Sequence, residues 1–264
     1  QNGFVGYHLT QTLRLEKDSF ELIGFDRIFF ECQERLDAFV SQCDVIVHLA
    51  ALNRHHEPQT IYNTNTALVR DLVASLDRTG SKAHIIIASS TQEERDNLYG
   101  KSKKEGRLIL SEWAKRAGGR LSGLVIPNVY GPFGHPFYNS VVATFCYQVA
   151  RNETPKIDVD GQLKLIYVGE LVEAIIHSIR ICDNSHENWI PHTAEAKVSE
   201  ILSLLQGFRD VYQEKGAFPE LRTDFELKLF NTYRCYIDIA TYFPRTFVQH
   251  VDDRGAFVEI ARHG

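Results

Sequence analysis

Three side chains in the first half of the chain have the types and spacing needed for proton transfer: Ser90, Tyr99 and Lys103. Tyr99 and Lys103 lie four residues apart in a run with helical spacing, so both project from one face of a helix. A lysine cation beside a phenol favours the phenolate and lowers the tyrosine pKa. Such a tyrosine can exchange a proton with a carbonyl oxygen near neutral pH. The pattern therefore indicates acid–base chemistry at a carbonyl, although a Tyr–Lys pair at this spacing also arises by chance.

The elements that must position these side chains alternate between strand and helix. Apolar runs predict strands at 20–25, 44–51, 84–88 and 121–126, and helical spacing predicts helices at 36–40, at 60–76 and from Tyr99 onward. This alternation is typical of an α/β fold with a doubly wound, parallel Rossmann-type sheet. Ligands of such sheets bind at the carboxyl ends of the strands. Ser90 ends one strand and Tyr99 begins the next helix, so both belong at that edge.

A glycine turn at the start of the sequence indicates a dinucleotide site. Gly3 and Gly6 open a helical run, where glycines let backbone N–H groups approach a pyrophosphate at the helix N-terminus. Asp26 and Arg27 follow the next predicted strand, at about the ~20-residue distance where an acid binds the adenosine ribose or an arginine binds a 2′-phosphate. Asp26 favours NAD and Arg27 favours NADP, and a surface ion pair is the alternative for both.

Composition narrows the class of protein. With 264 residues, of which 44% are hydrophobic and 24% charged, the chain has the composition of an ordinary globular protein of one or two domains. A net charge of −5 gives no reason to expect nucleic acid or an anionic membrane as a partner, and no apolar run approaches the ~20 residues of a membrane span. The five cysteines are scattered and the 11 histidines form no HxH or HExxH pattern. We therefore expect reduced thiols, a cytoplasmic protein and no metal site.

The character of the sequence changes after about residue 127. A loop-rich segment at 131–136 precedes a predicted helix at 141–149, strands at 157–159 and 163–168, and helices at 171–179, from Ser199 and at 220–230. We expect an NADP-binding Rossmann core at 1–127 and, at 128–246, mainly a smaller helical substrate lobe that covers the carboxyl ends of the sheet. An alternating β-like segment at 248–259 predicts a linker and the start of a further domain at 247–264.

The motifs occur together and in order, and as a set they resemble the extended short-chain dehydrogenase/reductases that act on nucleotide sugars. The set comprises the Gly3–Gly6 turn, Leu49-Ala50-Ala51, Ser90, Tyr99 with Lys103, and the segment 127–132. A closer resemblance is to the bifunctional bacterial reductases of capsular polysaccharide and O-antigen synthesis. It is carried by 47–50, 53–54, 99–103, 251–255 and, above all, 138–147. In that family the segment at 251–255 leads into a C-terminal cupin domain.

The resemblance implies an enzyme that uses NADPH to reduce the C4 ketone of a UDP-2-acetamido-2,6-dideoxy-hexos-4-ulose, on the route to UDP-N-acetyl-L-fucosamine. It implies that Tyr99 protonates the C4 oxygen, that Lys103 lowers the Tyr99 pKa and holds the nicotinamide ribose, and that Ser90 hydrogen-bonds the developing alkoxide. Metal-dependent epimerisation belongs to the cupin domain, which we expect to be truncated here, so we expect reductase chemistry alone. A homodimer formed through the helices at about 60–76 and 99–115 is also implied.

Family positions carry over to two groups of residues. The cofactor-binding group is Gly3, Phe4, Val5, Gly6, Asp26, Arg27, Leu49, Ala50, Ala51, Tyr99, Lys103, Pro127 and Val129. The substrate-binding group is Asn53, Arg54, Ser90, Asn128, Asn139 and Ser140. A solvated loop is the alternative for Asn53 and Arg54, and a helix N-cap is the alternative for Asn139 and Ser140. The expected cofactor is NADP(H), and Asp26 leaves NAD(H) open.

Other functions compete with ketone reduction. Nucleotide-sugar 4,6-dehydratases place an Asp-Glu pair directly after the active-site hydroxyl, where this chain has Thr91-Gln92, and glutamine is neither an acid nor a base. A C4 epimerase of the same superfamily would consume no external reductant. A non-catalytic dinucleotide-binding protein would be expected to lack Tyr99 or Lys103, and both are present.

Overall fold

The computed structural model describes residues 1–261, which fold into two compact units. The first unit comprises 1–129 and 168–192, and the second comprises 130–167 and the residues from 193 on. Residues 168–192 thus belong to the first unit, within the range 128–246 that the sequence assigned mainly to a substrate lobe. The last three positions of the segment 247–264 lie outside the described residues.

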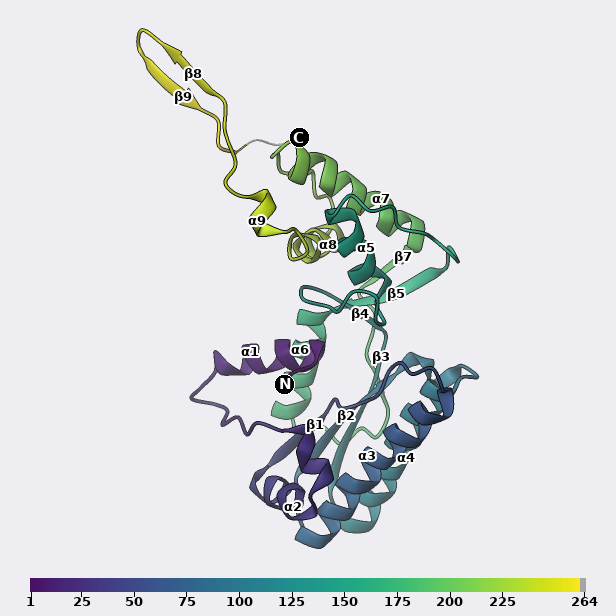
Figure 1. The fold of residues 1–264 in the computed structure, drawn as a ribbon. Helices are drawn as coiled ribbons and strands as arrows, with labels where there is room; N and C mark the ends of the chain where they lie inside the picture. Colours follow the sequence, from purple (N-terminus) through teal and green to yellow (C-terminus); the bar gives the residue numbers. More distant parts are fainter. Residues whose placement is uncertain (262–264) are drawn as a thin grey trace. The chain divides into compact units, whose positions relative to one another are not determined.

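The first unit is built on a four-stranded parallel sheet (Figure 1). Its strands, in spatial order, are β1 (Val45–His48), β2 (His84–Ser90), β3 (Arg120–Ile126) and β6 (Asn188–Trp189). Its helices are α1 (Phe4–Arg14), α2 (Gln33–Gln42), α3 (Pro58–Thr79), α4 (Leu98–Ala117) and α6 (Val168–Arg180), with 3-10 turns η1 (Arg27–Glu31) and η2 (Thr91–Glu94). α3 and α4 pack side by side against one face of the sheet, and α1 packs on α6 at the other. The predicted doubly wound α/β fold is confirmed.

β2 is the strand on which the site is built. Ile85, Ile86 and Ile87 are each no more than 1% exposed, as expected for a parallel strand covered by helices on both faces. At its carboxyl end, Ser90 lies opposite Ile126 of β3 in parallel register. Burial of this strand fixes its register, and with it the position of Ser90 at the edge of the sheet.

Two local signals explain where α4 begins and ends. At its start, the Asn97 side chain accepts a hydrogen bond from the backbone N–H of Gly100 at 2.7 Å, which satisfies one of the unpaired amides of the first turn. At its end, Gly118 adopts a left-handed conformation with φ of +65°, which glycine tolerates without strain. Helix α4 therefore starts one residue before Tyr99 and presents Tyr99 and Lys103 in its first two turns.

Two predicted strands are wrong. The segment 20–25 forms no ladder, and Phe25 instead pairs its backbone N–H and C=O with the side chain of Gln1, at 3.1 and 2.9 Å. In a doubly wound sheet this segment pairs with a strand before the glycine turn, and the described residues begin inside that turn. The segment 157–159 is also irregular: Val159 is 78% exposed, and the neighbouring Asp160 accepts hydrogen bonds from Ser199 instead.

The second unit has its own sheet and helical core. Its strands β4 (Asn128–Tyr130), β5 (Gln162–Tyr167) and β7 (Ala194–Lys197) form one sheet in that order. The helices are α5 (Val141–Ala150), α7 (Val198–Phe208), α8 (Asp224–Arg234) and α9 (Ile239–Tyr242), with a π-helical stretch η3 (Arg209–Glu214). Its core packs α5, α7 and α8 together through side chains such as Cys146, Leu205 and Leu229, all fully buried.

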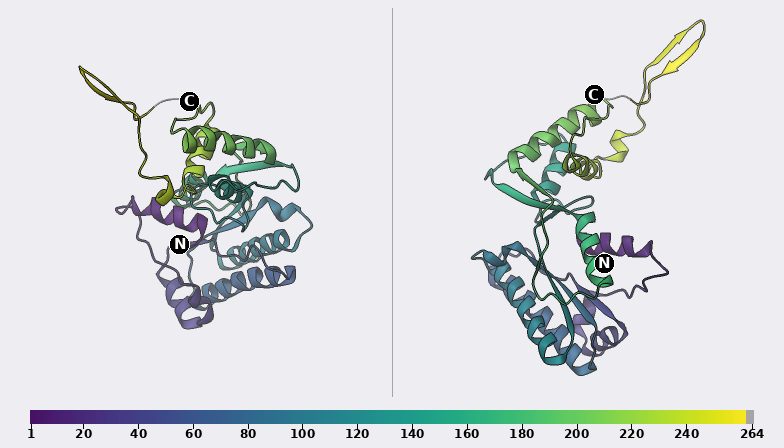
Figure 2. Two further views of the ribbon diagram at one scale, coloured as in Figure 1. Left: turned by 45° about the horizontal axis from the view of Figure 1, so that its top comes forward. Right: turned by 180° about the vertical axis from the view of Figure 1, so that it is seen from behind.

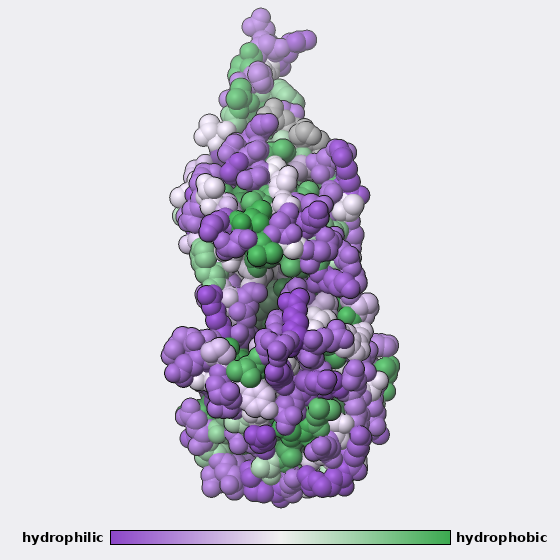
Figure 3. Space-filling view, turned by 90° about the vertical axis from the view of Figure 1, so that its right-hand side faces the viewer, coloured by the Kyte–Doolittle hydropathy of each residue, from purple (hydrophilic) through white to green (hydrophobic). Residues whose placement is uncertain are grey.

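The predicted β-like segment near the end of the chain forms an antiparallel hairpin, β8 (Gln249–Asp252) with β9 (Gly255–Val258). Figure 2 shows it extending away from the helices of its own unit, and all eight strand residues are exposed. Apolar side chains on it, including Val251 and Phe257, are exposed to solvent. The top of Figure 3 shows hydrophobic colouring among hydrophilic residues. Elsewhere, none of the helices within 1–261 combines the length and apolar character that a membrane span requires.

Candidate active site

Ser90 lies where β2 gives way to the turn η2. Its Oγ accepts a hydrogen bond from the backbone N–H of Gln92 at 3.2 Å, so the side chain acts as the N-cap of that turn. Ser90 is half-buried, whereas the adjacent Ser89 is buried. Because the N–H of Gln92 approaches the acceptor side of the Ser90 oxygen, the hydroxyl hydrogen stays available for donation.

Lys103 is a buried cation on α4. The residue is 7% exposed, and burial lowers its pKa to about 8, against the opposing influence of the Glu93 carboxylate. Lys103 therefore still carries its proton at neutral pH. Tyr99 lies one helical turn before it and is half-buried, so the phenol and the ammonium share the helix face predicted from their spacing.

A close backbone approach brings the Ser90 turn against this helix. Gly100 of α4 lies so near η2 that a Cβ atom built on it would be 1.9 Å from the carbonyl oxygen of Gln92. Only glycine fits there, and the glycine follows Tyr99 directly. The geometry therefore places the turn that begins at Ser90 against the helical turn that carries Tyr99 and Lys103.

Hydrogen bonds from α3 also hold the start of α4 in place. The side chain of Asn65 on α3 pairs with the backbone of Leu52, accepting at 2.6 Å and donating at 3.1 Å, and also donates to Ser102 Oγ at 3.0 Å. Ser102 in turn donates to the carbonyl of Tyr99 at 2.7 Å. Asn65 was not predicted from the sequence. The signal that could have found it is a polar residue on the predicted buried face of a helix.

His48, at the end of β1, faces the same region and is also buried. Burial and, to a lesser degree, the Lys103 cation lower its pKa to about 3, so the imidazole is neutral. Its Nε2 has no hydrogen-bond partner within residues 1–261. It lines a cavity of about 10 Å³ together with Asn65, Ser102 and Lys103, which is close to the volume that one water needs.

The N-terminus of α1 fits a dinucleotide pyrophosphate. Gly3 is the N-cap residue and provides no side-chain cap, so the first amides of the helix are open to an anion. The space around Gly3 is open, whereas a Cβ on Gly6 would lie 3.2 Å from the backbone of Gln1. Phe4 and Val5 supply the amides between them. These residues form a cradle of the kind that the cofactor requires.

Asp26 and Arg27, predicted to select the cofactor, lie at the start of the turn η1 after the segment 20–25. Asp26 Oδ1 accepts a hydrogen bond from the N–H of Ile28 at 3.0 Å and caps the turn η1. Both Asp26 and Arg27 are exposed. The N-cap role of Asp26 explains its presence without a ribose contact, which leaves Arg27 as the side chain with no structural task in this turn.

The remaining predicted residues fall into four groups. Leu49, Ala50 and Ala51 follow the end of β1 and Pro127 follows the end of β3, so these four lie at the carboxyl edge of the sheet of the first unit. Asn128 and Val129 come next and begin β4. Asn53 is half-buried and Arg54 is exposed in the loop after β1. Asn139 and Ser140 belong to the second unit, where Ser140 Oγ accepts from the N–H of Ala143 at 3.2 Å and caps α5.

Histidines and a glutamate gather in the loop after β1. His55, His56 and Glu57 have potential metal-ligand atoms within 4.8 Å of one another. The backbone N–H of Glu57 donates to His55 Nδ1 at 3.1 Å, and His56 and Glu57 are exposed. The cluster is explained by the local turn, and we assign it no metal.

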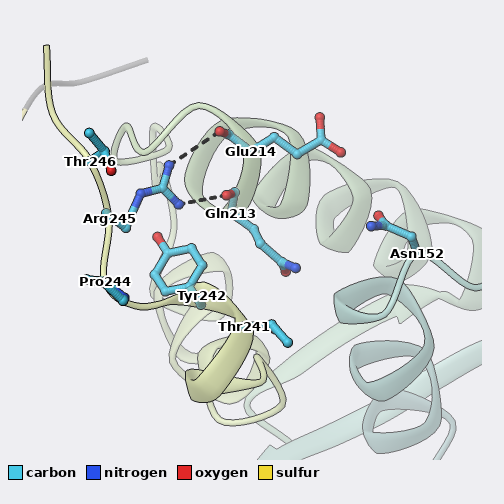
Figure 4. Close-up of a pocket in the computed structure, with 8 residues that line it drawn as sticks. All are labelled: Asn152, Gln213, Glu214, Thr241, Tyr242, Pro244, Arg245 and Thr246. Carbon is cyan, nitrogen blue, oxygen red and sulfur yellow. Dashed lines mark hydrogen bonds between the residues drawn. The ribbon is translucent and has the colours of Figure 1, made fainter.

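A larger cavity, of about 390 Å³, lies in the second unit beside η3 (Figure 4). Arg245 donates across it to the carbonyls of Gln213 and Glu214, at 2.9 and 3.4 Å, and its guanidinium lies 4.6 Å from the centre of the Tyr242 ring. The cation is thus engaged in holding the segment after α9 on η3. None of the residues predicted from the sequence to bind ligand lines this cavity.

Comparison with known proteins identifies the family of the chain. Residues 1–190 match the NAD dependent epimerase/dehydratase family. A curated relative, the UDP-2-acetamido-2,6-beta-L-arabino-hexul-4-ose reductase of Pseudomonas aeruginosa, is 27% identical over 99% of this chain and 69% of its own length. The family resemblance predicted from the motifs is confirmed.

Solved structures give the same result. The capsular polysaccharide assembling protein CapF of Staphylococcus aureus is 30% identical, with a TM-score of 0.80 over 98% of this chain and 69% of its own length. RMD of Pseudomonas aeruginosa, solved with NADPH, has a TM-score of 0.73 at 17% identity over 89% of this chain and 94% of its own, which shows a shared fold alone. The chain thus spans about two thirds of the length of CapF and of the curated reductase.

Proposed function

The chain belongs to the NAD dependent epimerase/dehydratase family, and on this premise we propose that it is an NADPH-dependent nucleotide-sugar ketoreductase. The observation that carries the proposal is the buried Lys103 cation on the helix face of Tyr99, with the Ser90 turn packed against that helix. Both partners that a ketone oxygen needs, a proton donor and a hydroxyl donor, thereby come from rigid elements at the carboxyl end of β2.

Each residue has one task in the proposed reaction. Tyr99 gives its phenolic proton to the carbonyl oxygen, and Ser90 donates a hydrogen bond to that oxygen as negative charge develops on it. Lys103 stabilises the phenolate left on Tyr99 and binds the ribose hydroxyls of the nicotinamide nucleotide. The N-terminal amides of α1 hold the pyrophosphate. NADPH held by these residues would supply the hydride that the ketone carbon accepts.

The relatives support a choice of substrate. The curated relative is named as a reductase of a UDP-linked 2-acetamido-2,6-dideoxy-4-keto hexose, and CapF is named for capsular polysaccharide assembly. We therefore propose that this chain reduces the C4 ketone of such a UDP-sugar, on a route to UDP-N-acetyl-L-fucosamine. Arg27 supports NADPH over NADH. A homodimer through α3 and α4, and a truncated cupin domain that starts within 247–264, are parts of the same proposal.

The test is turnover of the UDP-4-keto-hexosamine with NADPH, followed by the absorbance of the reduced nicotinamide. Wild type is expected to consume NADPH in proportion to the ketone, and Tyr99→Phe is expected to lose about 10²–10⁴-fold in kcat. Tyr212→Phe, a half-buried tyrosine of η3, is the matched control and should keep the wild-type rate. Product formation without NADPH consumption would indicate an epimerase and refute the reductase.

The pH profile gives a second test of the same proposal. Lys103 must carry its proton to stabilise the Tyr99 phenolate, and its pKa is about 8. The rate should therefore fall as pH rises through about 8. A rate that stays constant up to pH 9.5 would contradict the role of Lys103.

A further inference from the structure

A buried ion pair lies directly beneath the turn that presents Ser90. Glu93 of η2 accepts two hydrogen bonds from Arg107 of α4, with Nε to Oε1 at 3.0 Å and Nη2 to Oε2 at 2.7 Å. Ser89 Oγ donates to the same Oε1. The side chains of Arg107 and Glu93 are only 4% and 3% exposed. The set Ser89–Glu93–Arg107 is called the inner triad below.

The inner triad connects β2, η2 and α4, which carry Ser89, Glu93 and Arg107. The Nη1 atom of Arg107 donates to the backbone carbonyl of His186 at 3.1 Å and pairs with Glu187 at 2.9 Å, just before β6. The aliphatic stem of Arg107 packs over Gly123 of β3, where a Cβ atom would lie 2.8 Å from its Cδ. The donors of Arg107 are thus shared between η2 and the approach to β6.

The stability of the fold does not by itself explain why a charged pair is buried here. Burying two charges costs several kcal/mol per ion, which their attraction offsets only when the geometry is good, and apolar replacements are often as stable. Here the carboxylate comes from a 3-10 turn of four residues that begins directly after Ser90. Ser89 and Glu93, bonded to each other, bracket Ser90 and so restrict the conformation of its backbone.

Lys103 lies one helical turn before Arg107, and Glu93 is the negative charge that favours its protonated form. Within residues 1–261, His48 from β1 is a further ionisable group that interacts with Lys103, and it is neutral. Tyr99 lies four residues before Lys103 on α4 itself. Within residues 1–261, Glu93 is therefore the one carboxylate identified as acting on this lysine. The inner triad thus flanks Ser90 along the chain, and its carboxylate acts electrostatically on Lys103.

We propose that Glu93, held by Arg107 and Ser89, is a positioning residue of the reductase site: it fixes the turn that presents Ser90 and supplies a buried counter-charge to Lys103. The inference rests on the proposed function for its catalytic consequence, but its electrostatic part does not. Glu93 touches neither substrate nor cofactor in this scheme. It acts through Ser90 and Lys103.

The first test needs no substrate. A lysine whose folded-state pKa lies below its unfolded value binds fewer protons when folded, so stability rises with pH between the two values. In wild type this rise should begin near pH 8, the pKa of Lys103. In Glu93→Gln it should begin at lower pH, because the counter-charge is gone. Urea unfolding across pH 6–10 measures the rise, and the same series in Lys103→Met isolates the lysine contribution.

Two further variants keep this test decisive. Glu93→Gln leaves Arg107 with only the half-exposed Glu187 carboxylate and can fail to fold. The double variant Glu93→Gln with Arg107→Met removes both charges. Its stability should also begin to rise at a lower pH than that of wild type. Asp37→Asn is the control, because it breaks a similar Ser–carboxylate–Arg set between α2 and α3. In this variant the stability should begin to rise at the same pH as in wild type. If the free energy of unfolding begins to rise at the wild-type pH in every Glu93 variant, Glu93 does not act as a counter-charge to Lys103.

The second test uses the ketone and NADPH. Glu93→Gln should lower kcat by about tenfold, the loss expected when a hydroxyl donor is slightly displaced, with the KM for NADPH within about twofold of wild type. The fall of the rate on the basic side should move to lower pH with the Lys103 titration. A purely structural role would lower the amount of folded enzyme and leave the pH of that fall unchanged.

The outcomes separate the two proposals. Wild type that does not oxidise NADPH with the ketone refutes the proposed function, and the stability series still decides the counter-charge. Wild type that is active, together with Glu93→Gln at wild-type kcat and pH profile, leaves the function standing and overturns the positioning role.

Discussion

The first unit contains two arrangements with the same chemistry and different surroundings. In the inner triad, Glu93 accepts from Ser89 and is held by two nitrogens of Arg107. Between α2 and α3, Asp37 accepts from Ser75 at 2.6 Å and from Arg78 at 2.8 and 2.9 Å. This second set, Ser75–Asp37–Arg78, is called the outer triad. Each set joins one serine hydroxyl and two nitrogens of one arginine to a carboxylate, although the serine shares its oxygen with Nε in the inner triad and with Nη2 in the outer.

Burial separates the two triads. Arg107 and Glu93 are 4% and 3% exposed, whereas Arg78 and Asp37 are 37% and 23% exposed. Water therefore screens the outer pair, and hydrogen bonds from Arg78 and Ser75 simply lower the pKa of Asp37. The inner pair exchanges hydration for its partners, so loss of one partner is costly. A serine, a carboxylate and an arginine thus join two helices, α2 and α3, in one place and hold the turn of the candidate site in the other.

The largest expected difference follows from removing each arginine. Arg107→Met leaves the Glu93 carboxylate buried without its partner and should destabilise the protein by ~3–5 kcal/mol. Arg78→Met leaves Asp37 free to hydrate and should change the midpoint of urea unfolding only slightly. Urea unfolding at pH 7 measures both. Equal losses for the two variants would show that burial does not distinguish the triads.

The next effect concerns the glycine beneath the inner triad. An alanine methyl at Gly123 would lie 2.3 Å from the carbonyl oxygen of His186 and 2.8 Å from Cδ of Arg107. Gly123→Ala should therefore displace both acceptor and guanidinium and cost about 1–3 kcal/mol, as overpacking of a full core does. Gly80→Ala, near the outer triad, meets open space and tests only the strain of a positive φ. If thermal unfolding were unaffected by Gly123→Ala, the tight fit of Arg107 would be wrong.

How far the sequence predicts this structure depends on the range of the interactions. The fold was predictable because the isoleucine run of β2 and the helical spacing of α3 and α4 are local patterns. The candidate residues Ser90, Tyr99 and Lys103 were likewise found from short spacings. The prediction of a strand at 20–25 failed because a strand needs a pairing partner, and within residues 1–261 this segment pairs with none.

The two triads themselves could not be predicted. Glu93 and Arg107 are 14 residues apart on different elements, and Ser75 and Asp37 are separated by 38. No periodicity marks them, and a glutamate in a polar turn is ordinarily exposed. Burial of Glu93 depends on the close approach of η2 to α4 at Gly100, which is a tertiary property. The residues that hold the site in place were therefore harder to find than the residues proposed to do its chemistry.

A smaller contrast is expected from the two serines. Ser89→Ala removes a donor from a buried carboxylate and should cost about 1–3 kcal/mol, because a charged acceptor loses one of its bonds. Ser75→Ala leaves Asp37 with Arg78 and water, so it should cost less, although Ser75 itself is buried. Urea unfolding of the two alanine variants side by side measures the difference. A larger loss for Ser75→Ala would reverse the comparison.

The smallest expected effect is that of salt. At 1 M ionic strength the screening length falls to about 3 Å, and ion pairs in contact with water weaken while buried pairs are screened much less. The contribution of the outer triad, measured as the difference between wild type and Asp37→Asn, should shrink between 0.05 and 1 M sodium chloride. The corresponding difference for the inner triad, between wild type and Glu93→Gln, should stay constant. Parallel salt dependence in the two differences would mean that water reaches the Glu93 carboxylate, and the counter-charge to Lys103 would then be too weak to shift its protonation.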